Sequence, residues 1–224
     1  VSFDNNNATN SVYYSSDRTA TIKIDEANFF MEAFDKVENV ATTPATVVDE
    51  HLLITVKKVL NDGTETTKVY KNEELTTPFV KTSEGILEAT LLFDEDADYT
   101  LTIEYKDFSG NSADKYETFF TIDKTNPVIS VSYDNNDAIN ANCYKANRTA
   151  TFTVVEHNFR ASDIVVEPIS AIDVQGNTVD ISKDYQTLLR NGTWIDNGDT
   201  HTINIPFDVD AKYDFKVTYS DLAD

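Results

Sequence analysis

The three histidines, His51, His157 and His201, are the residues from which hydrolytic chemistry would have to be built. A hydrolase of that kind needs a serine or cysteine beside a histidine, with an acid orienting the ring. The histidines stand at unrelated points of the chain, and no glycine-rich turn surrounds any serine. Phosphate-cradling loops and paired cysteine–histidine metal motifs are also missing from the sequence. We therefore predict that the chain is not an enzyme and has no catalytic residues.

An acidic loop, Asp94-Glu95-Asp96-Ala97-Asp98, clusters oxygen ligands of the kind that calcium prefers. Its spacing is not that of an EF-hand, and aspartate also favours turns for reasons unrelated to metal binding. We favour a solvated loop in front of Tyr99, and the sequence predicts neither a metal site nor a cofactor.

The single tryptophan and the single cysteine allow two interpretations each. Trp194 could offer a stacking platform for a sugar, but a tryptophan between two packed sheets is the interpretation that we favour. Cys143 cannot form an internal disulfide, because it has no second cysteine to pair with. It takes the place of Tyr13 in an internal repeat described below, which favours a packing role.

Three apolar residues, Phe30, Met31 and Phe34, are the candidate contacts for a partner protein. They belong to a run with helical spacing that continues into a loop at Pro44. They would either form an exposed apolar surface or cover the end of the core.

The charge balance excludes two classes of partner. The chain has 39 acidic and 18 basic residues in 224, a net charge of −21. Phosphate backbones and anionic lipid surfaces repel such a chain, so we expect neither nucleic acid nor membrane as a partner. No apolar run approaches the roughly 20 residues of a membrane-spanning helix.

The elements that must position these residues are duplicated. Val1–Phe29 aligns without gaps with Val131–Phe159 at an offset of 130, with 15 identities in 29 positions. The alignment recovers later, where Tyr99 matches Tyr213. Gly63 and Gly176 are 113 apart, so the first copy holds 130 − 113 = 17 extra residues before this point. We interpret this as an internal repeat with one insertion.

Short runs of alternating polarity recur through both copies and predict strands. Ala20, Ile22 and Ile24 share one face of such a run, and their neighbours share the other. Turns at Gly63 and Gly176 predict one hairpin in each copy, and Tyr99 fits a tyrosine corner. The first copy closes with a strand at residues 116–122 that has no counterpart in the second, whose sheet should therefore have an edge that is unpaired or filled by a neighbouring molecule.

A family resemblance rests on residues in both copies. The segments Glu156-His157-Asn158-Phe159, Trp194 with Gly198-Asp199-Thr200-His201, and Tyr213 to Asp221 resemble the bacterial immunoglobulin-like (Big-type) domains of Gram-positive surface proteins. The first copy's residues 105–111 and 120–127 are similar to the closing segment of the same family. The resemblance implies an all-β sandwich displayed on a cell wall, with a spacer or adhesive role. It implies no catalytic residues.

The sequence thus predicts an all-β chain of two tandem immunoglobulin-like antiparallel β-sandwiches, the second lacking its last strand. The first domain spans residues 1–125 with an inserted segment near 30–46, and the second spans residues 126–224. The predicted function is a non-catalytic structural or adhesive module of a secreted or cell-wall-attached protein of a Gram-positive bacterium. The alternatives are direct binding of a host protein such as immunoglobulin or mucin, or an ancillary carbohydrate-binding module of a secreted enzyme. Expected partners are host extracellular proteins or glycans and neighbouring domains of the same chain.

Overall fold

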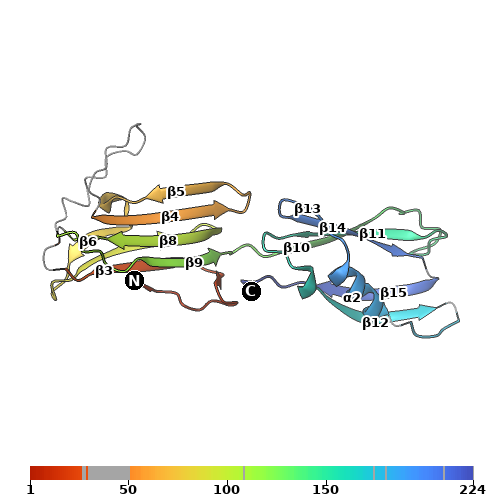
Figure 1. The fold of residues 1–224 in the computed structure, drawn as a ribbon. Helices are drawn as coiled ribbons and strands as arrows, with labels where there is room; N and C mark the ends of the chain where they lie inside the picture. Colours follow the sequence, from red (N-terminus) through yellow and green to blue (C-terminus); the bar gives the residue numbers. More distant parts are fainter. Residues whose placement is uncertain are drawn as a thin grey trace. The chain divides into compact units, whose positions relative to one another are not determined.

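The structure is a computed structural model that describes residues 1–26, 29, 51–107, 109–173, 175–179, 181–208 and 210–223. The chain divides into two compact units, Val1–Lys124 (unit 1) and Thr125–Leu222 (unit 2). Each unit is built around antiparallel sheets (Figure 1).

The first sheet of unit 1 has four strands in the order β1-β3-β7-β6. These strands are β1 (Ser2–Phe3), β3 (Arg18–Ile24), β7 (Leu87–Phe93) and β6 (Thr77–Lys81). Burial alternates along β3 as the sequence predicts, because successive side chains point to opposite faces of a sheet.

The second sheet of unit 1 has five strands in the order β2-β9-β8-β4-β5 (Figure 1). They are β2 (Tyr13–Tyr14), β9 (Tyr116–Ile122), β8 (Ala97–Tyr105), β4 (Leu52–Leu60) and β5 (Glu65–Val69). The predicted hairpin at Gly63 is confirmed, because β4 pairs with β5 and Gly63 has a φ of 80°. A short 3-10 helix, η1 (Asn72–Glu74), leads to β6.

Both sheets of unit 1 contribute to one core, in which Phe120 of β9 is 1% exposed. Its ring lies 5.0 Å from Phe93 and 5.4 Å from both Phe3 and Tyr99, measured between centroids. Edge-to-face and offset contacts of this kind add to the free energy gained by burial alone.

Unit 2 repeats the first sheet strand for strand, in the order β10-β11-β14-β13. The strands are β10 (Val128–Tyr133), β11 (Arg148–Val155), β14 (Thr200–Phe207) and β13 (Ile195–Asn197). The register is repeated as well, and the matching pairs are Ser2↔Thr21 with Ser132↔Thr151, Phe3↔Ala20 with Tyr133↔Ala150, and Arg18↔Phe93 with Arg148↔Phe207.

The second sheet of unit 2 has two strands in the described residues, β12 (Val165–Asp173) and β15 (Ala211–Thr218). A 3-10 helix, η2 (Ala161–Asp163), precedes β12. The turn at Gly176 is present, since the Asp173 N–H donates to the Asn177 carbonyl at 2.9 Å. The predicted return strand is wrong, however: a single bridge between Ile172 and Thr178 is followed by a helix.

This helix, α2 (Ile181–Asn191), packs against β12 and β14 (Figure 1). Leu189 is 1% exposed, and the Tyr185 ring stacks on Phe207 with centroids 5.0 Å apart. Residues four apart share one face of a helix, so Tyr185 and Leu189 point into the core together.

Each copy holds an arginine against aromatic rings. The Arg18 guanidinium lies 3.9 Å from the Phe3 centroid and 3.8 Å from the Tyr14 centroid, and its Nε donates to the Asn5 carbonyl at 2.9 Å. In unit 2, Arg148 lies 3.8 Å from the centroids of both Tyr133 and Tyr144, and its Nε donates to the Asn135 carbonyl at 2.7 Å. A cation over a ring face is attracted by the ring's quadrupole.

The predicted tyrosine corner is confirmed at Tyr99, which is 4% exposed and whose hydroxyl donates to the Glu95 carbonyl at 3.1 Å. Its burial raises the pKa of the Tyr99 hydroxyl well above its usual value. The matching Tyr213 is half-buried and packs edge-to-face on Phe207, with centroids 5.0 Å apart.

The prediction of an all-β chain is confirmed at this level. The described residues form several antiparallel sheets with one short α-helix, an arrangement consistent with β-sandwich architecture.

Candidate functional site

The candidate partner contacts Phe30, Met31 and Phe34 lie outside the described residues. The described residue nearest to them in sequence is Phe29, whose ring lies 6.3 Å from Phe79 and 5.7 Å from Tyr105. Phe29 therefore packs against the core of unit 1.

Trp194 is half-buried at the end of α2. Its indole Nε1–H donates to the Leu189 carbonyl at 2.8 Å, and its ring lies 4.7 Å from Phe159 in an edge-to-face arrangement. The hydrogen bond satisfies a carbonyl of the last helical turn that has no partner within the helix. These contacts favour the packing interpretation of Trp194 over a sugar-binding platform.

Phe159 is the centre of an aromatic cluster in unit 2. Its ring stacks on His201 at 4.5 Å and lies 5.4 Å from Tyr219, in addition to its contact with Trp194. The Tyr219 hydroxyl accepts a hydrogen bond from the Arg160 backbone N–H at 3.1 Å. Burial raises the pKa of Tyr219 to about 12, so this hydroxyl stays neutral at physiological pH.

The histidines are bound to acceptors and not to a nucleophile. His201 Nδ1 lies 2.6 Å from Asp196 Oδ1, and its Nε2 lies 2.8 Å from the Glu156 carbonyl. His157 Nδ1 lies 2.9 Å from Asp199 Oδ1. A general base must reach the proton it removes, and both ring nitrogens of His201 are already engaged. The His157–Asp199 contact instead links the turn after β11 to the turn before β14, and the His201 contacts link β14 to β13 and to the end of β11.

The acidic loop 94–98 is bonded to the rest of unit 1 through its side chains and its backbone. Glu95 forms an ion pair with Lys58, and Asp98 accepts a hydrogen bond from the Thr121 hydroxyl at 2.5 Å. The Lys124 ammonium donates to the Asp94 carbonyl at 2.6 Å. These bonds hold the loop over the end of its sheet, as expected of a loop in front of a tyrosine corner.

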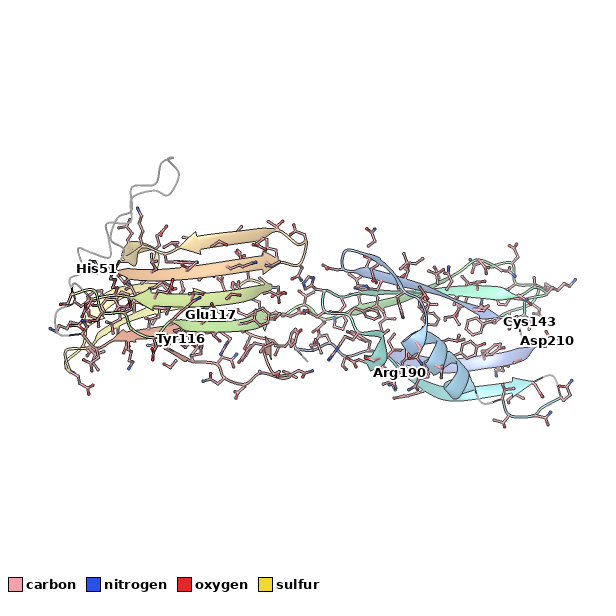
Figure 2. All side chains as sticks on the ribbon, viewed as in Figure 1. His51, Tyr116, Glu117, Cys143, Arg190 and Asp210 are labelled. Atoms are coloured by element: carbon pink, nitrogen blue, oxygen red, sulfur yellow. The ribbon has the colours of Figure 1, made fainter. Side chains whose placement is uncertain are left out.

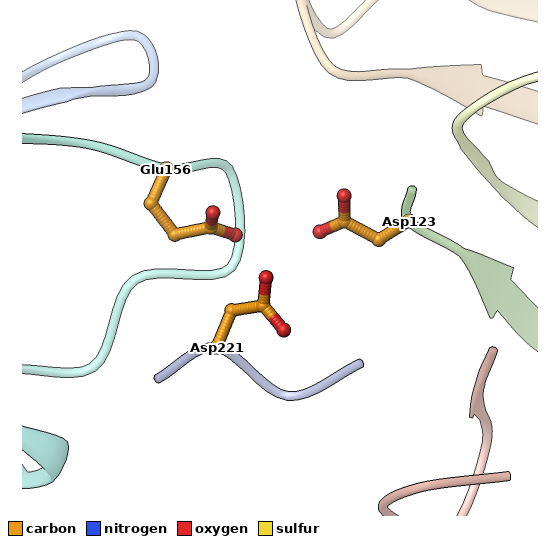
Figure 3. A group of neighbouring side chains, drawn as sticks. All are labelled: Asp123, Glu156 and Asp221. Carbon is orange, nitrogen blue, oxygen red and sulfur yellow. The ribbon is translucent and has the colours of Figure 1, made fainter. Parts of the chain in front are cut away.

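Two carboxylates that the sequence analysis did not bring together meet in unit 2. Ligand oxygens of Glu156 and Asp221 lie within 4.8 Å of each other, and Figure 3 shows the two carboxylates turned toward one another. Glu156 Oε1 also accepts the Asn158 backbone N–H at 3.0 Å. Calcium takes six to eight oxygen ligands, so this pair alone does not define a metal site.

The third side chain drawn in Figure 3, Asp123, belongs to unit 1, where its backbone N–H donates to the Tyr14 carbonyl at 3.0 Å. A sequence signal for the pair in unit 2 did exist. Glu156 repeats Glu26 at an offset of 130, and Asp221 repeats Asp107 at an offset of 114.

Comparison of the sequence with models of protein families finds no match, and comparison with curated proteins finds none. In the described residues, no helix is both long enough and apolar enough to cross a membrane. The resemblance to bacterial immunoglobulin-like domains thus stays a prediction from the residues that carry it.

Proposed function

We propose that the chain is a non-catalytic structural module of a bacterial surface protein, made of two tandem immunoglobulin-like domains. The domains correspond to residues 1–125 and 126–224, and the parent protein is secreted or attached to the cell wall of a Gram-positive bacterium. The role is that of a spacer or adhesive stalk.

The observation that carries this proposal is the repeated sheet. Four strands recur in the same order, and the pairings of β3 with β1 and β7 keep their register in β11 with β10 and β14, although only about half of the first 29 positions are identical. A unit that repeats its framework and varies its surface is typical of modular proteins whose length or display matters more than a single reactive site.

Two features of the side chains agree with this role. The polar groups that would be needed for hydrolysis are used in local bonds, such as those of His201 to Asp196 and Glu156. The net charge of −21 keeps a displayed domain soluble and opposes self-association. Trp194, with its indole bonded to Leu189, gives the carbohydrate-binding alternative no support.

Single-molecule force spectroscopy tests the structural role. A chain tethered through its ends should show two unfolding events, one per unit. Each event should release roughly 3.6 Å of chain per residue, or on the order of 350–450 Å before the folded length is subtracted. A single event that releases the whole chain, or featureless extension, would contradict two modules that resist force independently.

Surface display is tested separately on the bacterium that makes the protein. Antibodies raised against the chain should label intact cells or be absorbed by the culture medium. Labelling that appears only after the cells are made permeable would overturn the proposed location.

A further inference from the structure

The turn between β13 and β14 carries an asparagine that is followed directly by a glycine, Asn197-Gly198 (Figure 1). The two strands pair as far as Asn197↔Thr200, so Gly198 and Asp199 alone connect them. Gly198 has a φ of 58°, a conformation that glycine adopts without steric cost because it has no Cβ. The Asn197 side chain is exposed, so water reaches it at the end of the hairpin.

An asparagine in such a position can react with its own backbone. The nitrogen of the next residue attacks the side-chain amide carbon Cγ, its proton passes to water, and the side-chain nitrogen leaves as ammonia. Water then opens the resulting five-membered succinimide at either carbonyl. One product is aspartate, and the other is isoaspartate, in which the main chain runs through the former side chain. Glycine is the least hindered nucleophile for this attack, because it lacks a side chain.

The backbone N–H of Gly198 differs from that of the other glycines. The chain has six glycines, all of them among the described residues. Five of them donate their N–H to the backbone carbonyl three or four residues earlier, at 2.8–3.1 Å, and these are Gly63, Gly85, Gly110, Gly176 and Gly192. The Gly198 N–H makes no hydrogen bond within the described part of the chain. Its nitrogen is therefore available without first breaking a bond.

The chain contains a second Asn-Gly pair, Asn191-Gly192, which provides the comparison. Asn191 is as exposed as Asn197, so exposure does not separate the two sites. However, the Gly192 N–H donates to the Leu188 carbonyl at 2.9 Å. Asn191 is the last residue of α2, and side chains of a helix lean toward its N-terminus, away from the following backbone nitrogen.

The end of α2 is also anchored to the rest of unit 2. Arg190, which Figure 2 labels on this helix, donates from Nε to the Ile164 carbonyl at 2.7 Å. The helix end must therefore open before the Gly192 nitrogen can reach the Asn191 side chain. The same dipeptide thus occurs once in a reactive environment and once in a protected one.

We propose that Asn197 is a site of spontaneous covalent modification, at which attack by the Gly198 nitrogen converts asparagine to aspartate and isoaspartate. Asn191 stays unmodified while the chain is folded. Water is the co-reactant, and ammonia is released. The reaction needs no enzyme and is independent of the structural role proposed above.

The modification changes the hairpin in which it occurs. Either product places a new carboxylate between Asp196 and Asp199, and neighbouring like charges are destabilising. Isoaspartate also adds one carbon to the main chain before the turn, which is incompatible with the Asn197↔Thr200 pairing. We therefore expect β13 to loosen, together with the contact between Asp196 Oδ1 and His201 Nδ1 at 2.6 Å.

The test incubates the full folded chain at neutral pH in water enriched in oxygen-18. Ring opening incorporates the heavy oxygen, and peptide mapping by mass spectrometry then locates it. Incorporation at Asn197 should exceed that at Asn191 by at least about tenfold, because the helix end has to open locally before Asn191 can react. In urea the two sites should react at similar rates, since unfolding removes the hydrogen bond of Gly192.

Two variants serve as controls. Asn197→Gln should abolish incorporation in the β13–β14 hairpin, because its longer side chain closes a six-membered ring far more slowly. Asn191→Gln should leave incorporation at Asn197 unchanged. The isoaspartate form of the native chain, separated by chromatography, should show faster hydrogen exchange at Ile195–Asn197 and altered fluorescence of Trp194, the residue before β13.

Three results would overturn the proposal. The first is equal incorporation at Asn191 and Asn197 in the folded chain, which would mean that the hydrogen bond of Gly192 gives no protection. The second is an unreactive Asn197 in the folded chain while the chain in urea reacts, which would mean that the turn itself prevents the attack. The last is unchanged exchange of β13 in the isoaspartate form, which would contradict the predicted loosening of the hairpin.

Discussion

Two adjacent phenylalanines of β9 provide the sharpest test of the fold. Phe120 is 1% exposed and contacts rings on both sheets of unit 1, whereas Phe119, one position earlier, is 49% exposed on the opposite face. Replacing a buried phenylalanine with alanine costs about 3–5 kcal/mol in transfer and cavity free energy. The exposed neighbour should cost less than about 1 kcal/mol, because half of its ring is already in water.

These free energies convert to temperatures through the size of the unit. Unfolding entropy is about 2.1 cal/mol/K per residue, so the 124 residues of Val1–Lys124 give about 0.26 kcal/mol/K. Phe120→Ala should therefore lower the melting temperature of unit 1 by about 12–19 °C. Phe119→Ala should lower it by less than about 4 °C on the same basis.

The single tryptophan separates the two units in the measurement. Trp194 lies in unit 2, so its fluorescence follows that unit, while calorimetry follows both. Phe120→Ala should move one calorimetric transition and leave the fluorescence transition in place. The reasoning is refuted if the two variants shift alike, or if the fluorescence transition moves with Phe120→Ala.

Three further substitutions test local features. Asp4→Asn should destabilise unit 1 at pH 7 and have little effect at pH 2, as measured by urea titrations at both pH values. Hydrogen bonds from the Thr19 backbone lower the pKa of Asp4. The stabilisation by the Asp4 carboxylate is therefore present above the usual carboxyl pKa range and is lost as the pH falls through the lowered pKa. Tyr99→Phe should cost about 1 kcal/mol in chemical denaturation, because it removes the buried hydroxyl bonded to the Glu95 carbonyl. Gly192→Ala should lower the fluorescence melting temperature of unit 2, since a Cβ there would clash with the Leu188 backbone carbonyl oxygen as well as with Ile203 Cδ1. Wild-type stability in this variant would contradict the packing.

The features that the sequence predicted well are those with local signals. Alternating polarity predicted β3 and β11, because each needs only its own residues to show a buried face. The hairpin at Gly63 and the corner at Tyr99 likewise depend on a few neighbouring residues. The internal repeat then extended the strand predictions to the matching strands of the second copy.

The same repeat misled at α2. Helical spacing is present in the sequence at Ile181, Tyr185, Leu188 and Leu189, and Gly192 follows as a signal that ends a helix. The hairpin in the first copy favours a hairpin in the second, which conflicts with this helical periodicity. For the Glu156–Asp221 pair the repeat marks each residue but does not show that they meet, because 65 positions separate them and only the folded chain brings them together.

The two units also indicate where their roles can diverge. A one-residue slip in β10–β11 would turn its buried side chains outward, which explains why this pair keeps the register of β1–β3. The second sheets carry no such constraint in common: β4 pairs with β5 in unit 1, whereas α2 packs on β12 in unit 2. The backbone frameworks of the two units therefore differ most in the second sheet.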